Sequence, residues 1–276
     1  MSLLIKLIKI IQIFKYRILG YKFSIDRLEI LKHQLNLYSI NLKNRKELNI
    51  NYQYLLGSNI DKIRFIQIDI EKFTGYEGFY VFNEIAPLFN CAKELYENPK
   101  IRLEDSSLYH FYNEFQPINY EELYKLSKTN SLSKISSLYD FKPWLHSFIN
   151  IKSIRNGLFG PINKNDIQHR FIRIKNILKN IEQFGYCPTE KDIIKGYLLI
   201  SNNDYRFLIT AGHHRVAALK AINLYQPNRF KKVLTKFEER RTNLKAVYEK
   251  DIYQWPAVKS NCCSIQDAKE LFYKYF

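Results

Sequence analysis

The first twenty residues combine apolar and basic side chains with the period of an α-helix. At about 100° per residue, most apolar residues fall within one sector of about 100°, and the polar residues lie opposite. The apolar sector contains Leu3, Leu4, Leu7, Ile10, Ile11, Phe14 and Ile18, and the opposite sector contains Lys6, Lys9, Gln12, Tyr16 and Arg17. The pattern predicts an amphipathic basic helix over residues 1–23. Such a helix either lies on an anionic membrane surface or docks on the protein's own core.

Lysines interrupt this segment too often for a membrane span, which needs about 20 predominantly apolar residues. A cleavable signal peptide needs an uncharged apolar region and a small-residue cleavage site, and neither is present. We expect a cytoplasmic protein, peripheral on the inner face of the cytoplasmic membrane. The expected membrane contacts are Leu3, Leu7, Ile10, Phe14, Lys6 and Lys9.

Apolar periodicity between residues 24 and 150 predicts an α+β accessory or substrate region that begins mainly helical. Residues 26–48 have a helical period, Ile63–Ile70 and Phe79–Phe82 resemble strands, and a helix is expected over residues 84–97. Two short helices are expected on either side of Gln116-Pro117, followed by a loop at residues 127–140.

The clearest succession of elements lies between residues 160 and 224. Helical spacing covers Asp166–Phe184 and ends at Gly185, and two apolar strands, Tyr197–Ile200 and Tyr205–Thr210, predict a hairpin around Asn202-Asn203-Asp204. The string Ala211-Gly212-His213-His214-Arg215, called the box below, then leads into an Ala/Leu-rich helix at residues 216–222. The basic run between Arg229 and Arg241 is predicted to lie on a further helix, and an amphipathic helix is predicted at Ser264–Phe276.

Composition and charge narrow the class of protein. The 276 residues are 46% hydrophobic and carry a formal net charge of +16, which excludes a disordered or low-complexity chain and fits a folded one. Four cysteines without a Cys-x-x-Cys pair give no disulfide framework and no zinc motif. Residues 151–276 carry a net charge of +12, against +4 for residues 1–150. The basic half keeps nucleic acid open as an alternative partner.

The box has the chemistry of an anion site. A glycine between a strand and a helix start lets an anion approach free backbone N–H groups at the positive end of the helix dipole. Arg215 in the first helical turn supplies a bidentate cation for phosphate. Either His213 or His214 could polarise a phosphate oxygen or serve as a general base near neutral pH, and either could instead hold the structure together.

Other candidates lie on the helix that precedes the hairpin. Arg170 and Arg173 are three residues apart, so they share a face and could complete the anion site. A kinase needs a carboxylate to orient the acceptor hydroxyl or to hold Mg²⁺. Asp166 is the acid of this helix before Glu182 and is therefore the candidate.

The succession of helix, hairpin, box and helix resembles the ParB/sulfiredoxin-like superfamily over roughly 65 residues. The wider chain resembles ParB-like proteins of bacterial surface-polysaccharide and glycolipid gene clusters. This second resemblance rests on Phe111-Tyr112, Phe115-Gln116-Pro117, Pro143-Trp144, Phe159-Gly160-Pro161, Trp255-Pro256-Ala257-Val258 and Ala268–Phe276. It implies a small mixed sheet with flanking helices over residues 151–276, as the nucleotide-binding domain of an α+β protein.

The resemblance also implies a function. A nucleoside di- or triphosphate (ATP, ADP or CTP), with Mg²⁺, would bind at Thr210, Ala211, Gly212, Arg215, Arg173 and Arg170. The implied reaction is phosphoryl transfer to a small-molecule or glycolipid substrate, through a sugar or lipid-linked glycan hydroxyl, with His213, His214 and Asp166 as catalytic candidates.

Departures from the superfamily patterns keep alternatives open. His213 stands where sulfiredoxins have the catalytic cysteine, which excludes sulfinic acid reduction, and Ala211 replaces the acid of the Asp-Gly-His-His-Arg box of free serine kinases. The residues after Ile222 contain no helix-turn-helix pattern, which weighs against a DNA-binding protein of the chromosome-partitioning kind. The two remaining alternatives are a nucleic-acid-binding nucleotide switch and a non-catalytic scaffold of a glycan-assembly complex.

Overall fold

The computed structural model describes seven stretches of the chain. They are residues 64–75, 86–114, 142–145, 161–189, 192–202, 204–238 and 244–276. The chain divides into two compact units, Met1–Arg45 and Lys46–Phe276, and every described residue belongs to the second. The helices predicted at residues 1–23 and 26–48, the strand at Phe79–Phe82 and the loop at residues 127–140 lie outside the described residues.

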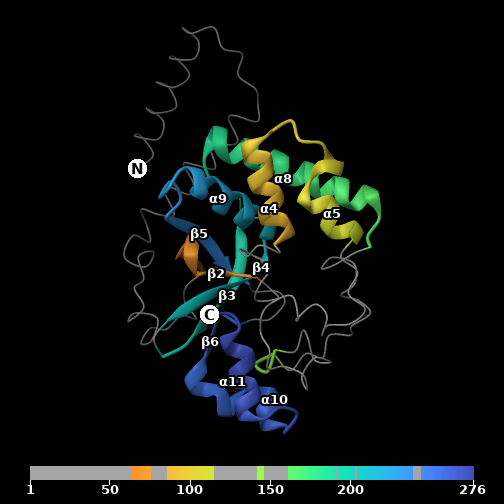
Figure 1. Cartoon of the computed structure of the whole chain (residues 1–276). Coiled ribbons are helices and arrows are strands. Elements are labelled where there is room, and N and C mark those ends of the chain that lie inside the picture. The colour runs from red at the N-terminus through yellow and green to blue at the C-terminus, as the bar shows by residue number, and fades with distance from the viewer. Residues whose placement is uncertain are drawn as a thin grey trace, which may run out of the picture. The chain divides into compact units, whose positions relative to one another are not determined.

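A mixed sheet forms the centre of the second unit (Figure 1). Its six described strands are β1 (Phe65–Asp69), β2 (Phe73–Thr74), β3 (Ile194–Ile200), β4 (Tyr205–Ala211), β5 (Lys232–Phe237) and β6 (Ala246–Tyr248). Their order is β1-β5-β3-β4-β2, and β6 pairs with β3 beyond the end of β5. Pairs β1–β5 and β3–β4 are antiparallel, whereas β5–β3, β6–β3 and β2–β4 are parallel. The prediction of an α+β protein with a mixed sheet is therefore confirmed.

Strands β3 and β4 form the predicted hairpin, with Tyr197 opposite Leu208 and Ile200 opposite Tyr205. The register shifts between Lys195 and Gly196, where the chain bulges. At Gly196 an added Cβ would lie 2.1 Å from the backbone oxygen of Leu208, so only glycine allows this close approach of the two strands.

Helices cover one face of this sheet. They are α4 (Pro87–Glu97), α5 (Ser107–Glu114), α8 (Lys164–Phe184) and α9 (His213–Tyr225), which pack together as one layer (Figure 1). Leu198 and Phe207 point from the sheet into this layer and share its core with Ile174 of α8 and Leu219 of α9. The helix predicted at Asp166–Phe184 is confirmed. Asn163 caps its start, and Gly185 ends it at a φ of 74°.

The opposite face of the sheet packs against an aromatic cluster. Because side chains alternate along a strand, Tyr197 and Leu208 point away from the helical layer, toward Trp144 and Phe272. The indole Nε1 of Trp144 donates a hydrogen bond to the Tyr197 hydroxyl at 3.1 Å. The elements on this side are the 3₁₀-helix η5 (Glu249–Gln254), α10 (Pro256–Lys259) and α11 (Ile265–Tyr273). Helix α11 confirms the helix predicted at Ser264–Phe276.

The helix predicted over the basic run between Arg229 and Arg241 is wrong. Its described part contains strand β5, which pairs with β1 on one side and β3 on the other. The apolar and β-branched residues Val233, Leu234 and Thr235 are buried, whereas Lys232 is exposed. The lysines obscured a short central strand whose stability comes from pairing on both sides.

The sheet joins segments from both sides of the predicted domain boundary at residue 150. Strands β1 and β2 come from the region predicted as accessory, and they pair with β5 and β4. Helices α4 and α5, from the same region, pack with α9 and α8. Among the described residues, no helix has the length and apolar character to cross a bilayer.

Candidate functional site

A cleft of about 430 Å³ lies between α8 and the start of α9. Helix α8 contributes His169, Ile172, Arg173, Asn176, Ile177 and Asn180, and the other side is formed by Asp192 and Arg215. The volume is within the usual range for small-molecule sites, roughly 300–1,000 Å³. The lining combines two arginines, one carboxylate and two side-chain amides, which suits a polar ligand with negative charge.

Gly212 shapes the turn from β4 into α9. It is the N-cap of the helix in the left-handed region, with a φ of 101°, which favours glycine. Its carbonyl accepts hydrogen bonds from the backbone N–H groups of Arg215 at 2.9 Å and Val216 at 3.1 Å. An added Cβ would lie 3.0 Å from the Cγ1 atom of Ile194, so the position also lacks room for a side chain.

Tyr186, directly after α8, braces the start of β3 behind this turn. Its hydroxyl accepts a hydrogen bond from the backbone N–H of Ile194 at 3.3 Å and donates one to the carbonyl of Leu234 at 3.3 Å. Burial raises the pKa of Tyr186 far above its ordinary value, so the hydroxyl stays protonated and able to donate. The brace fixes Ile194 and thereby the surface on which Gly212 packs.

Arg215 already has an anionic partner in the cleft. Its Nη2 donates to Oδ1 of Asp192 at 2.7 Å, with 19% of the arginine side chain and 53% of the aspartate side chain exposed. The other carboxylate oxygen of Asp192 accepts from the Thr189 hydroxyl at 3.0 Å. A partly exposed ion pair contributes little to the stability of the fold. An anion with more negative charge, such as a phosphate group, could therefore displace the carboxylate from Arg215.

The other predicted residues of α8 point in different directions. Arg173 is exposed and lines the cleft beside Arg215. Arg170 donates instead to the hydroxyl of Tyr112 on α5 at 2.8 Å, and its guanidinium lies 5.0 Å from the centre of that ring. Asp166 is exposed in the first turn of α8 and does not line the cleft.

Both box histidines are half-buried in the first turn of α9, and neither lines the cleft. The Nε2 atom of His214 is buried and has no hydrogen-bond partner among the residues that the structure describes. Burial, followed by the positive charges of Arg173 and Arg170, lowers the pKa of His214 to about 3. His214 is therefore neutral at physiological pH and is a weak base there.

Thr210 and Ala211 occupy the end of β4. The side chain of Thr210 has the same orientation along the strand as Leu208, on the sheet face opposite to α8 and α9. Its hydroxyl donates to a carboxylate oxygen of buried Glu238 at 3.2 Å. Of these two residues, Thr210 can thus contact a ligand in the cleft only through its backbone. Ala211 pairs with Lys195 in the hairpin.

The structure identifies Asp192 as a site residue that sequence reasoning missed. Asp192 lies 23 positions before Arg215, in the turn that precedes β3. The predicted hairpin could have placed Asp192 beside the box, because antiparallel pairing brings the residues before β3 next to those after β4. The pairing of Lys195 with Ala211 brings this turn to the box.

The described residues offer a limited set of metal ligands. They contain no group of three His, Cys, Asp or Glu side chains arranged to hold a metal ion. Asp192 is the carboxylate that lines the cleft. Since Mg²⁺ is commonly held by one or two carboxylates together with phosphate oxygens, Asp192 fits such a role only when a phosphorylated ligand is present.

The arrangement is suited to binding a phosphate ester. Two guanidinium groups from separate helices, Arg173 and Arg215, reach the cleft where α9 begins, and a carboxylate lies beside them. Arginine recognises phosphate through paired N–H donors, and the helix start adds the positive end of its dipole. Comparisons of the chain with protein-family models, with curated proteins and with solved structures find no match.

Proposed function

We propose that this chain binds a nucleoside di- or triphosphate in the cleft between α8 and α9 and transfers a phosphoryl group from it to a hydroxyl. The observation that carries the proposal is that Arg173 and Arg215 both line the cleft beside the start of α9, where Gly212 forms the turn from β4 into the helix. Phosphoryl transfer depends on positioning the phosphate and on neutralising its negative charge. Two arginines and the positive end of a helix dipole can do both.

In this proposal the ion pair between Arg215 and Asp192 changes partners when the nucleotide binds. Arg215 turns to a phosphate oxygen, which frees the Asp192 carboxylate to orient the acceptor hydroxyl or to meet Mg²⁺. Asp192 thereby takes the role that the sequence had suggested for Asp166, which lies outside the cleft lining. It would also compensate for Ala211, where free serine kinases have an acid.

In this proposal the two box histidines, His213 and His214, are catalytic candidates, and the protonation of His214 depends on the bound nucleotide. His214 is neutral because it is buried and lies near several positive charges. A phosphate group bound to Arg173 and Arg215 would offset these charges and raise the pKa of His214. His214 then contributes to catalysis only in the nucleotide complex, and His213 remains a catalytic candidate by resemblance.

The acceptor, the fold family and the location belong to the same proposal. The order of helix, hairpin, box and helix supports a ParB/sulfiredoxin-like arrangement. The wider resemblance supports a sugar or lipid-linked glycan hydroxyl as acceptor, in surface polysaccharide or glycolipid biosynthesis. A substrate of this kind favours a cytoplasmic protein held at the inner face of the membrane by its first 23 residues.

Nucleotide binding is tested by calorimetric titration of the full chain with ATP, ADP, CTP and GTP in the presence of Mg²⁺, with duplex DNA as a further arm. Arg173→Ala and Arg215→Ala should each weaken the preferred nucleotide roughly 10- to 100-fold, the value of a charge-assisted hydrogen bond. Arg102→Ala is the matched control, because Arg102 is an exposed arginine that pairs with Asp105 and does not line the cleft. Unchanged affinity in both folded cleft variants would overturn the assignment of the site.

Phosphoryl transfer is tested by following nucleotide consumption with candidate glycan acceptors. Asp192→Asn should lower turnover roughly 10²- to 10⁴-fold, the usual contribution of a general acid or base. In the absence of Mg²⁺, the same substitution should preserve or increase nucleotide affinity, because it releases Arg215. Nucleotide binding without turnover on any acceptor would favour a non-catalytic scaffold, and binding of duplex DNA in place of nucleotides would favour the nucleic-acid alternative.

A further inference from the structure

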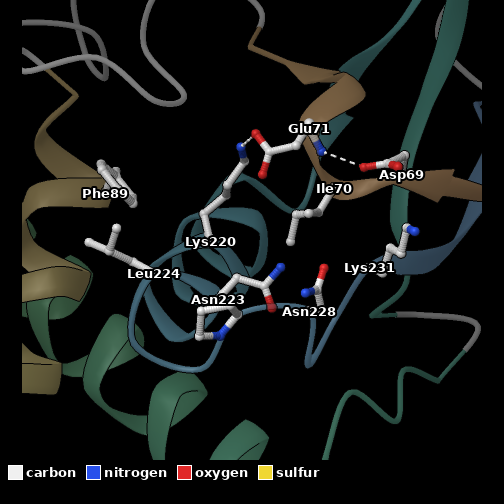
Figure 2. Close-up of a pocket in the computed structure, with 10 residues that line it drawn as sticks. Asp69, Ile70, Glu71, Phe89, Lys220, Asn223, Leu224, Asn228 and Lys231 are labelled. Atoms are coloured by element: carbon white, nitrogen blue, oxygen red, sulfur yellow. Dashed lines mark hydrogen bonds and ion pairs between the residues drawn. The ribbon is translucent and has the colours of Figure 1, made fainter.

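A second cavity, of about 510 Å³, lies toward the opposite end of α9 (Figure 2). Three parts of the chain that are distant in sequence form it: Asp69–Glu71 around the 3₁₀-helix η2 (Ile70–Lys72), Phe89 of α4, and the end of α9 with the turn after it. At 1.5 Å per residue, Leu224 lies roughly 16 Å along the helix from His213. The cavity is therefore separate from the cleft described above.

One side of the cavity is apolar. Phe89 of α4 and Leu224 of α9 lie together on this side, whereas the buried Ile70 lies nearer to Asp69 and Lys231 (Figure 2). Leu224 is 54% exposed, and Phe89 is only partly buried. A ligand that covered these side chains would gain the hydrophobic contribution of about 25 cal/mol per Å² of apolar surface removed from water.

The other side carries opposite charges that do not neutralise each other. Lys220 pairs with Glu71 at the rim, which leaves Asp69 and Lys231 at the polar end (Figure 2). Among the described residues, neither of these two forms an ion pair. One oxygen of Asp69 accepts from the backbone N–H of Glu71 at 3.0 Å, and within the described part of the chain its second oxygen accepts no hydrogen bond. Lys231 is exposed.

Backbone geometry holds this polar end in place. The N–H of Ile70 donates to the carbonyl of Lys231 at 3.0 Å, which fixes the two segments side by side. Asn228 adopts a φ of 67° in the turn after α9, and its amide lies at the same end of the cavity (Figure 2). Asn223 ties the turn to the helix, because its side chain accepts from the N–H of Phe230 at 2.8 Å.

We propose that this cavity binds a free α-amino acid with an apolar side chain. The ammonium group would bind the carboxylate of Asp69, the carboxylate would bind Lys231 and the amide of Asn228, and the side chain would cover Phe89 and Leu224. A zwitterion matches two opposite charges that share one end of a cavity without pairing. A ligand with a single charge would leave either Asp69 or Lys231 unsatisfied. The site is independent of the proposed nucleotide cleft.

The test is a calorimetric or NMR titration of the full chain with L-phenylalanine and with two analogues that each lack one charge, phenethylamine and 3-phenylpropanoate. L-phenylalanine should bind, and each analogue should bind roughly 10- to 100-fold more weakly, because one charge-assisted contact is lost. Asp69→Asn, which keeps an oxygen to cap η2, and Lys231→Met should reduce L-phenylalanine affinity by similar factors.

Two controls separate this site from general effects. Lys175→Met removes an exposed lysine of α8 that does not line the cavity, and Arg215→Ala alters only the other cleft. Both should leave L-phenylalanine affinity unchanged. Equal affinity for the analogues, retained affinity in Asp69→Asn and Lys231→Met, or no binding of L-phenylalanine or L-leucine at millimolar concentration would overturn the proposal.

Discussion

At the residue scale, His214 makes the most direct link between the site and a measurable property. Its pKa falls from 6.5 to about 3 because of burial and the nearby charges of Arg173, Arg170, His213 and Arg215. Between these pH values the unfolded chain binds a proton at this position that the folded chain does not. The free energy of unfolding should therefore fall as the pH is lowered from about 6.5 toward 3, on the order of 5 kcal/mol in all, with no such contribution above pH 7.

Urea unfolding of the intact chain and of His214→Gln across this pH range measures the effect. Glutamine has no comparable titration, so the variant should lose less stability on acidification than the intact chain. The control is His110→Gln, because the His110 side chain is 54% exposed and forms a hydrogen bond with Glu114. Parallel pH profiles for the intact chain and His214→Gln would contradict the prediction.

Residue types at the site could be predicted from the sequence better than their partners could. Gly212 and Arg215 stand out because a glycine and an arginine between a strand and a helix form a local pattern typical of anion sites. The orientations of Arg170 and Thr210 depend on Tyr112 and Glu238, which are 58 and 28 positions away. Local periodicity contains no information on such distant partners, so the sequence could not separate Arg170 from Arg173.

At the element scale, Gly196 controls how β3 and β4 pair. A Cβ at this position would lie 2.1 Å from the Leu208 oxygen and 2.7 Å from the Phe207 ring, where neither backbone nor a buried ring can move aside. Gly196→Ala should therefore lower the free energy of unfolding by about 3 kcal/mol, the upper end of the usual cost of overpacking a buried position. Urea titration followed by circular dichroism measures it.

The neighbouring position provides the control for that experiment. Lys195→Ala alters the same strand without adding an atom near Leu208, so it should cost less than about 1 kcal/mol. If Gly196→Ala were as stable as Lys195→Ala, the close approach of the two strands would not exist in solution.

Elements with a strong local pattern were predicted, including strand β1 within Ile63–Ile70, whereas strand β5 was not. Helix α8 has a regular apolar period and a glycine at its end, and the hairpin β3–β4 has a polar turn between two apolar runs. Strand β5 carries lysines at both ends of its apolar centre and depends on β1 and β3. Its type was therefore predicted incorrectly from local pattern.

At the scale of the whole molecule, the sheet is assembled from segments far apart in the chain. Phe65 pairs with Lys236 and Phe73 pairs with Phe207, across more than 130 intervening positions in each case. The register of such pairs is set by burial on both faces, with the helical layer on one side and the aromatic cluster around Trp144 on the other. A sequence divided into local segments could not reveal that β1 and β2 complete the sheet that carries the box.

The membrane interaction is a prediction about the full chain. Residues 1–23 carry five basic and no acidic residues, and each basic residue near an anionic surface contributes about 1 kcal/mol. The full chain should bind vesicles that contain anionic lipid and should ignore neutral vesicles. Leu7→Asp with Phe14→Asp, and separately Lys6→Glu with Lys9→Glu, should each weaken binding at least about tenfold in a vesicle co-sedimentation assay.

Lys175→Glu with Lys179→Glu makes the same charge change as the lysine pair, on the exposed face of α8, and should have a smaller effect. Binding that depends equally on all three pairs would mean that net charge, and not the amphipathic segment, attracts the protein to the membrane.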